Sequence, residues 1–148
     1  MTEEPRIVSA EREIAADAAA IFELIADPSK QPEWDGNENL DSADAGQRVR
    51  ESGSVFVMRN TGNSTRENHV VEFEEGRRIA WQPSPVGEAR PGHLWRWELE
   101  PLESGATLVR HTYDWSQLTD ETRFERARST TADALRASID RLAALAEG

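Results

Sequence analysis

The segment from Thr119 to Glu147 contains no glycine or proline, and it constrains the possible folds of this chain more than any other segment. Asp120 and Thr122 offer side-chain oxygens that can cap the free amides of a helix start. An apolar stripe then recurs at helical spacing: Phe124, Thr131, Leu135, Ile139, Leu142 and Ala146. The pattern predicts one continuous helix, roughly 40 Å long at about 1.5 Å per residue. A helix with a single apolar stripe needs a broad apolar surface to pack against.

The preceding residues supply that surface as a predicted sheet. Apolar and polar residues alternate most cleanly in 92–100 and 107–115, as in antiparallel strands with one covered face. The covered face of these two strands would carry His93, Trp95, Trp97, Leu99, Val109, His111, Tyr113 and Trp115. Further strands are predicted at 6–14, 46–50, 55–59, 66–73 and 78–82. In these last two, His69, Val71 and Phe73 are expected on one face of 66–73, and Ile79 and Trp81 on one face of 78–82.

Two short helices are predicted between the first strand and the rest of the sheet. Asp17 is placed to cap a helix with an apolar side that includes Ile21 and Phe22. Asp27-Pro28 ends this helix, because the residue before a proline is pushed out of the helical region. The segment 28–35 holds a second helical turn. Its Trp34 stands in a polar neighbourhood and either covers the core or lies at an opening.

A run of strands followed by a helix predicts an α+β domain. We expect a curved antiparallel sheet of six to seven strands wrapped around a long C-terminal helix, as a single domain over 1–148. A sheet that curls around one helix commonly leaves a cavity at one end.

The amino-acid composition limits which binding partners are expected. The chain of 148 residues has 28 acidic and 17 basic residues, which gives a net charge of −11. This charge repels nucleic acid and anionic membrane surfaces, so neither is an expected partner. Without cysteine there is no disulfide and no thiolate chemistry. No signal peptide or membrane span is predicted, so we expect a cytoplasmic monomer or homodimer with no stable membrane insertion.

Several segments carry a resemblance to a known family. They are Glu11–Ile14, Asp17–Pro28, Gln31–Trp34, Gly76–Trp81 and the uninterrupted C-terminal helix. Together they resemble the START-like (SRPBCC, Bet v 1-like) superfamily, in its polyketide cyclase/dehydrase and lipid-transport branch. The resemblance spans nearly the whole chain and implies the helix-grip fold. It also implies that lipids, sterols, hormones or polyketide intermediates bind between sheet and helix, and it transfers no catalytic residue set.

The covered face of the sheet combines aromatic rings with hydrogen-bonding groups, as a pocket for a flat, partly oxygenated molecule requires. The expected ligand-binding residues are Trp34, His69, Trp81, Trp95, Trp97, His111, Tyr113 and Arg128. The alternative interpretation is that the tryptophans fill the core and each histidine is tied to a backbone carbonyl.

Arg128 is anomalous on the predicted helix. At about 100° per residue around the helix axis, Arg128 lies within roughly 20° of Leu135 and so inside the apolar stripe. A buried arginine must be paired, because an isolated buried charge is very costly. It could bind a ligand carboxylate or enolate, pair with Asp114 or a loop acid, or extend its stem to water.

Three functions remain open. The leading hypothesis is binding of an apolar or aromatic molecule, lipid- or polyketide-like. The second is a cofactor-independent cyclase or dehydratase in which His111 acts as base beside Tyr113 and Arg128. The third is a protein-interaction module without a ligand. No metal or cofactor is expected, because the histidines lack zinc-site spacing and the chain has no phosphate-binding or Rossmann glycine motif.

Overall fold

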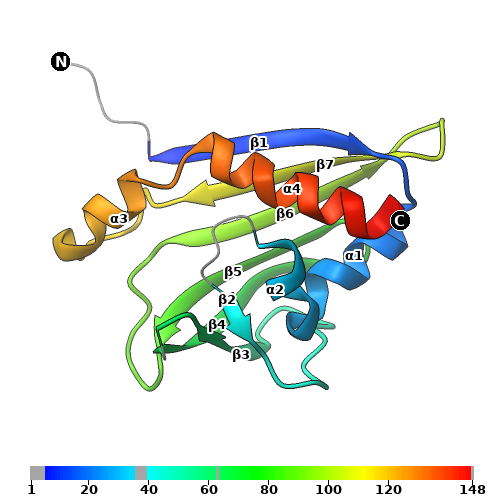
Figure 1. The fold of residues 1–148 in the computed structure, drawn as a ribbon. Helices are drawn as coiled ribbons and strands as arrows, with labels where there is room; N and C mark the ends of the chain where they lie inside the picture. The colour runs from blue at the N-terminus through cyan, green and yellow to red at the C-terminus, as the bar shows by residue number, and fades with distance from the viewer. Residues whose placement is uncertain (1–5, 36–39, 63, 148) are drawn as a thin grey trace, which may run out of the picture.

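The structure, a computed structural model, describes residues 6–35, 40–62 and 64–147. Its strands are β1 (Ile7–Ile14), β2 (Leu40–Ser42), β3 (Val55–Asn60), β4 (Ser64–Glu74), β5 (Arg78–Pro85), β6 (Leu94–Pro101) and β7 (Thr107–Asp114). Its helices are α1 (Ala18–Ala26), η1 (Pro28–Lys30), α2 (Gln31–Trp34), η2 (Glu121–Arg123), α3 (Phe124–Arg128) and α4 (Ala132–Glu147). Figure 1 shows α4 lying along the sheet, with α1 and α2 beside it.

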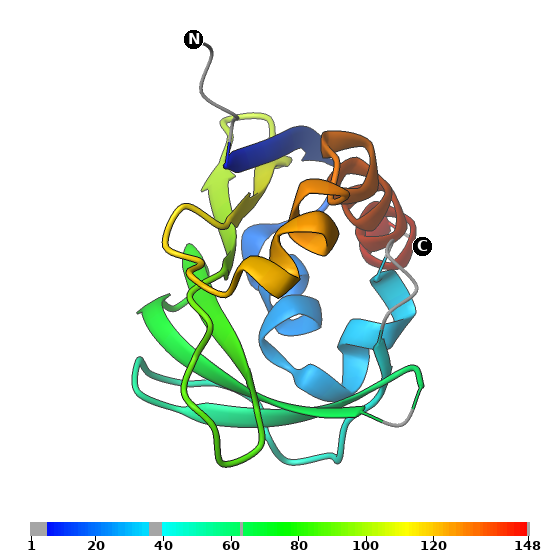
Figure 2. The same cartoon turned by 90° about the vertical axis from the view of Figure 1, so that its left-hand side faces the viewer.

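The strands form one antiparallel sheet in the order β1-β7-β6-β5-β4-β3-β2. The sheet curves around the helices, so that α4 packs against β1 and β7 while α1 and α2 lie across its concave side (Figure 2). Leu135, Ile139 and Leu142 of α4 are fully buried against this surface. Burial of each is worth roughly 1.5–3 kcal/mol, which makes this stripe a main source of stability. The helix-grip fold predicted from the sequence is confirmed.

The two strands with the clearest alternation have the predicted faces. In β7, Val109, His111 and Tyr113 are buried, and in β6 the buried side chains are Trp97 and Leu99. Their neighbours Arg110 and Glu98 are partly or fully exposed on the other face. Alternation over eight residues therefore identified the core side of both strands correctly.

The helices after β1 begin and end where the sequence predicts. The Asp17 side chain accepts a hydrogen bond from the Ala20 amide at 2.9 Å and caps α1. Asp27 then leaves the helical region and accepts from the Ser29 amide at 3.1 Å, which starts η1. Trp34 ends α2, buried, and its indole Nε1 donates to the Leu24 carbonyl at 2.7 Å.

The predicted strand at 46–50 is wrong. This segment is irregular, and the strand that precedes β3 in the sheet is the three-residue β2. The Val49 amide donates to the Ala26 carbonyl at the end of α1, and the Val49 side chain is buried. The segment therefore closes the core beside α1 instead of joining the sheet.

The predicted face of β4 is wrong for His69 and Val71. Val70 is buried and pairs with Trp81, whereas Val71 is exposed, so the residues before the irregularity have the opposite orientation to that predicted. The register shifts between Val70 and Glu72, and Phe73 returns to the concave side, against Phe22. A β-bulge of this kind inserts one residue and reverses the alternation on one side of it.

The C-terminal helix is long, but its predicted continuity from Thr119 is wrong. The long α4 begins only at Ala132, after the short η2 and α3 and a break at 129–131. The Ser129 hydroxyl donates to the Arg126 carbonyl at 2.6 Å, and the Thr131 hydroxyl accepts from the Ala134 amide at 3.2 Å. Short hydroxyl side chains compete with the backbone for helical hydrogen bonds, which explains a break here without glycine or proline.

Candidate functional site

A cavity of about 140 Å³ opens between the concave side of the sheet and the helices α2 and α3. Its wall combines aromatic rings with polar and charged side chains, and the rings come from α2, from β5 to β7 and from the residue just before β6. They belong to Trp34, Trp81, His93, Trp95, His111 and Tyr113. The cavity is close in size to the roughly 150 Å³ engineered cavity that holds benzene, and it is not fully enclosed, so one aromatic ring can lie inside while the rest of a larger molecule extends outward.

Five of the eight predicted site residues meet at this cavity: Trp34, Trp81, Trp95, His111 and Tyr113. Trp97 lies one layer deeper in the core, where it packs edge-on against Trp34 at 5.1 Å between ring centroids. His69 does not line the cavity, because the β4 bulge places it on the other face, where its Nε2 lies 3.1 Å from the Ser84 hydroxyl. The remaining prediction concerns Arg128.

The structure places Arg128 outside the cavity. Its side chain is exposed at the end of α3, with the guanidinium 5.9 Å from the Trp115 ring centroid. The prediction of a buried Arg128 is wrong because the helical wheel was extended through the break at Ser129–Thr131. The turn of the chain at that break separates the face of α3 from the stripe of α4.

His111 is held rigidly at the inner wall. Its ring stacks on Trp97 at 3.8 Å with an interplanar angle of 13°. Its Nδ1 lies 3.1 Å from the Arg96 carbonyl, and because a carbonyl only accepts, the ring proton is on Nδ1 and Nε2 carries the lone pair. Burial lowers the pKa of His111 to about 3 from the ordinary 6.5. The imidazole is therefore neutral at physiological pH.

Tyr113 and His93 form the next part of the wall. Tyr113 packs against Trp95 at 4.3 Å and against His93 at 6.1 Å between ring centroids. Burial raises the pKa of Tyr113 to about 12, so the phenol keeps its proton. Burial, and next the positive charges of Arg123 and Arg126, lower the pKa of His93 to about 4. All three titratable rings at the cavity are therefore uncharged near neutral pH.

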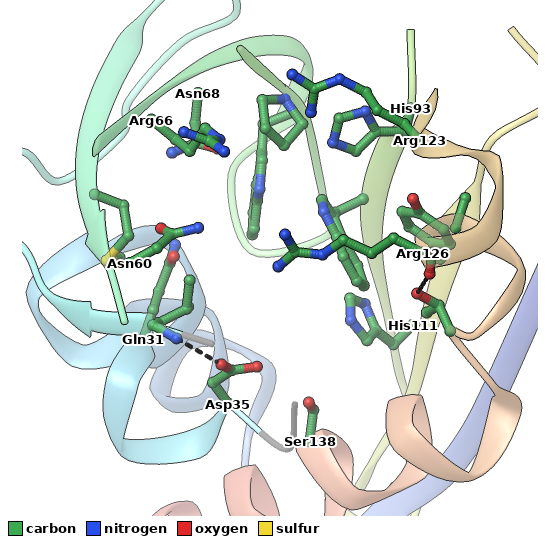
Figure 3. Close-up of a pocket in the computed structure, with 18 of the residues that line it drawn as sticks. Gln31, Asp35, Asn60, Arg66, Asn68, His93, His111, Arg123, Arg126 and Ser138 are labelled. Atoms are coloured by element: carbon green, nitrogen blue, oxygen red, sulfur yellow. Dashed lines mark hydrogen bonds between the residues drawn. The ribbon is translucent and has the colours of Figure 1, made fainter. Parts of the chain in front are cut away.

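Three arginines at the cavity were missed from the sequence. Arg66 reaches it from β4, Arg123 from η2 and Arg126 from α3. Figure 3 shows their side chains directed toward the space in front of His93 and His111. The sequence pattern placed Arg126 on the outer side of a single long helix. It gave no signal for Arg66, which lies in an ordinary polar strand segment.

The opposite end of the cavity is polar and tightly bonded. The buried Gln31 side chain donates to the Ile25 carbonyl at 3.0 Å. A carboxylate oxygen of the buried Asp35 accepts from the Leu40 amide at 3.0 Å, and Arg141 donates to the Asp35 carbonyl at 2.7 Å. The bond from Gln31 ties α2 to α1, and the bond from Arg141 ties the end of α2 to α4.

Within residues 6–35, 40–62 and 64–147, no three histidine and carboxylate side chains gather closely enough to hold a metal ion. In the same part of the chain, no helix has the length and apolar character needed to cross a membrane. The site is thus defined by aromatic rings, neutral polar groups and arginines.

Residues 5–147 match the family described as polyketide cyclase/dehydrase and lipid transport, and the chain belongs to that family. An uncharacterized protein of Mycobacterium tuberculosis strain H37Rv is 32% identical over 114 residues, which is 75% of this chain and 48% of the relative. The chain therefore spans about half the length of the curated relatives it matches.

Solved structures share the fold at low sequence identity. The ginseng major latex-like protein 151 from Panax ginseng is 14% identical with a TM-score of 0.61, covering 96% of this chain and 97% of that one. DynU16, a protein of the dynemicin biosynthetic locus, is 16% identical with a TM-score of 0.67, covering 97% of this chain and 48% of its own. These likenesses confirm the Bet v 1-like architecture.

Proposed function

We propose that this protein binds a small apolar or aromatic molecule in the cavity between the sheet and the C-terminal helices. The single observation that carries the proposal is the cavity of about 140 Å³ walled by Trp81 and Trp95. Large aromatic side chains normally fill space when they are buried, but here they surround it. Membership of a family described by lipid transport and by polyketide cyclisation supports the same ligand class.

The acid–base properties of the wall favour binding over catalysis. A general base works best when its pKa lies near the operating pH. The pKa of His111 is about 3 and that of Tyr113 about 12, so neither group exchanges a proton readily at neutral pH. As neutral groups they suit recognition instead, because His111 Nε2 accepts a hydrogen bond and the Tyr113 hydroxyl donates one.

The second candidate is a cofactor-independent cyclase or dehydratase. The observation in its favour is that polar groups, among them His111, Tyr113 and Arg126, converge on one cavity. Turnover of a bound polyketide-like compound would distinguish it from simple binding. A filled interior would have favoured the interaction-module hypothesis, so the cavity weighs against it. Cytoplasmic location and a monomeric or homodimeric state remain predictions from the sequence.

Filling the cavity provides the test. Thr130 lines the cavity, whereas its neighbour Ser129 is exposed and outside the lining. We expect 2-naphthamide, a neutral two-ring probe, to bind one molecule per chain in isothermal titration calorimetry. Thr130→Phe should weaken this binding by about tenfold or more, because the new ring occupies the space of the probe.

Ser129→Phe is the matched control, since it adds the same ring at the next position and should leave the affinity unchanged. Circular dichroism checks that both variants fold. Equal binding by wild type and Thr130→Phe would contradict the cavity as the binding site. Failure of the wild type to bind either 2-naphthamide or its acid, 2-naphthoate, would contradict the proposed function itself.

A further inference from the structure

Positive charge gathers at the cavity of a strongly acidic protein. The chain has a net charge of −11, yet the lining contributed by the described residues includes Arg66, Arg123 and Arg126 and one carboxylate, Asp35. The three arginines come from β4, η2 and α3, so the fold and not the local sequence brings them together. Chance placement of surface charge in such a chain would favour acids around any opening.

Arginines on the convex side of the sheet are arranged differently. There, Arg96 pairs with Glu72 at 2.6 Å and Arg110 pairs with Glu11 at 2.8 Å. The first pair joins β6 to β4 across the intervening β5, and the second joins the neighbouring strands β7 and β1, so each arginine already has an opposite charge beside it. Arginine at the cavity instead lies close to arginine.

The cavity arginines are near enough to affect each other. Burial lowers the pKa of Arg66, and the charges of Arg123 and Arg126 lower it further, while Glu88 acts in the opposite direction. Arg123 also lies 3.2 Å from Asp120, an exposed acid at the outer side of η2. The Asp35 carboxylate already accepts a hydrogen bond from the Leu40 amide. Arg66 is therefore a partly buried cation that lies near two further positive charges at the cavity.

His93 adds a second indication at the same place. It lines the cavity beside Arg123, as Figure 3 shows, and its buried Nδ1 has no hydrogen-bond partner within the described residues. A buried polar nitrogen without a partner is uncommon in folded proteins, and this one lies where a ligand atom could bond to it. In the tautomer that protonates Nδ1, this nitrogen would donate to an oxygen placed between the arginines.

We propose that the ligand carries an anionic oxygen group, a carboxylate or a phosphate, which lies against Arg66, Arg123 and Arg126 while its aromatic body contacts Trp81 and Trp95. This inference rests on the proposed function and specifies the chemistry of its ligand. The planar guanidinium matches both oxyanions with two parallel hydrogen bonds. The anion would also offset the repulsion that Arg123 and Arg126 exert on the partly buried Arg66.

Three probes with the same ring system test the proposal: 2-naphthoate, 2-naphthyl phosphate and neutral 2-naphthamide. Calorimetry at low salt should show that at least one anion binds about tenfold or more tightly than the amide. Raising the salt concentration should weaken the binding of the anionic probes but not that of the amide, because salt screens partly exposed charges. The better anion identifies which oxyanion the site prefers.

Arg66→Gln and Arg126→Gln should each remove most of this preference and leave the affinity for 2-naphthamide nearly unchanged. Arg128→Gln is the matched control, since Arg128 lies on the same short helix as Arg126 but outside the cavity lining, and it should keep the preference. Thermal unfolding of each variant confirms that the fold is retained.

The outcomes separate this inference from the function on which it rests. Equal affinity for the three probes would overturn the anion proposal and leave the aromatic-binding function standing. An anion preference that persists in both cavity variants, or disappears in Arg128→Gln, would place the anion elsewhere and overturn the assignment. If no probe binds to the wild type, the proposed function fails and the anion proposal fails with it.

Discussion

Gly92→Ala is expected to destabilise the fold by about 3 kcal/mol or more, a large effect for one methyl group. Gly92 has a φ of 119°, in a region that residues with a side chain rarely adopt. A Cβ at this position would collide with the carbonyl of Gln117, which is backbone and cannot turn aside. The strand entry before His93 and the segment that leads to Leu118 would have to separate.

Gly105→Ala is the matched control, and urea denaturation is the measurement. Gly105 also has a positive φ, of 91°, but nothing lies within 4 Å of its added Cβ. Gly105→Ala should therefore lower the free energy of unfolding by only about 1 kcal/mol, because only the backbone conformation is unfavourable. Equal losses of unfolding free energy in the two variants would show that the close approach of Gly92 to the Gln117 carbonyl does not affect stability. Because both His93 and Leu118 line the cavity, Gly92→Ala should also weaken ligand binding.

Acidification from pH 7 to pH 5 is expected to reduce the free energy of unfolding by about 2 kcal/mol through His111 alone. Burial lowers the pKa of His111 to about 3 in the folded protein, against 6.5 in the unfolded chain. The unfolded state takes up a proton as the pH falls through 6.5, and the folded state does not. The stabilisation is therefore complete above about pH 6.5 and is lost progressively as the pH falls toward 3. His93, with a pKa of about 4, acts in the same direction.

Denaturation of wild type and His111→Gln at several pH values measures this effect. The variant should lose about 2 kcal/mol less than the wild type between pH 7 and pH 5, whatever its stability at pH 7, since glutamine does not titrate. A direct NMR titration of the His111 ring should show no protonation down to about pH 4. Protonation of that ring near pH 6.5 in the folded protein would contradict its burial between Trp95 and Trp97.

The fold was predictable because its strongest signals are local. Alternation in β6 and β7 and the 3.6-residue period around Ile139 each report directly which side is covered, and both were confirmed. Asp17 and the Asp27-Pro28 pair mark helix ends through their own backbone preferences, so α1 was also found. Such features depend on a few neighbouring residues and not on the rest of the fold.

The errors have a common physical origin in single-residue irregularities. One inserted residue in β4 reversed the face of His69, and a break at Ser129–Thr131 changed the direction in which Arg128 points. Each irregularity propagates to every residue whose orientation is counted through it. The arginine cluster was not predictable, because Arg66 is 57 positions before Arg123 in the numbering and only the tertiary fold joins them.

The indole N–H resonances of the five tryptophans test the central claim most directly, through a titration of ¹⁵N-labelled protein with 2-naphthoate. If the ligand enters the cavity, the resonances of Trp81 and Trp95 shift most, because their rings line it. The resonance of Trp115 shifts less, because its ring is outside the cavity lining. Fixed resonances of Trp81 and Trp95 at saturating probe, or an equal shift of Trp115, would contradict a ligand-binding cavity at this position.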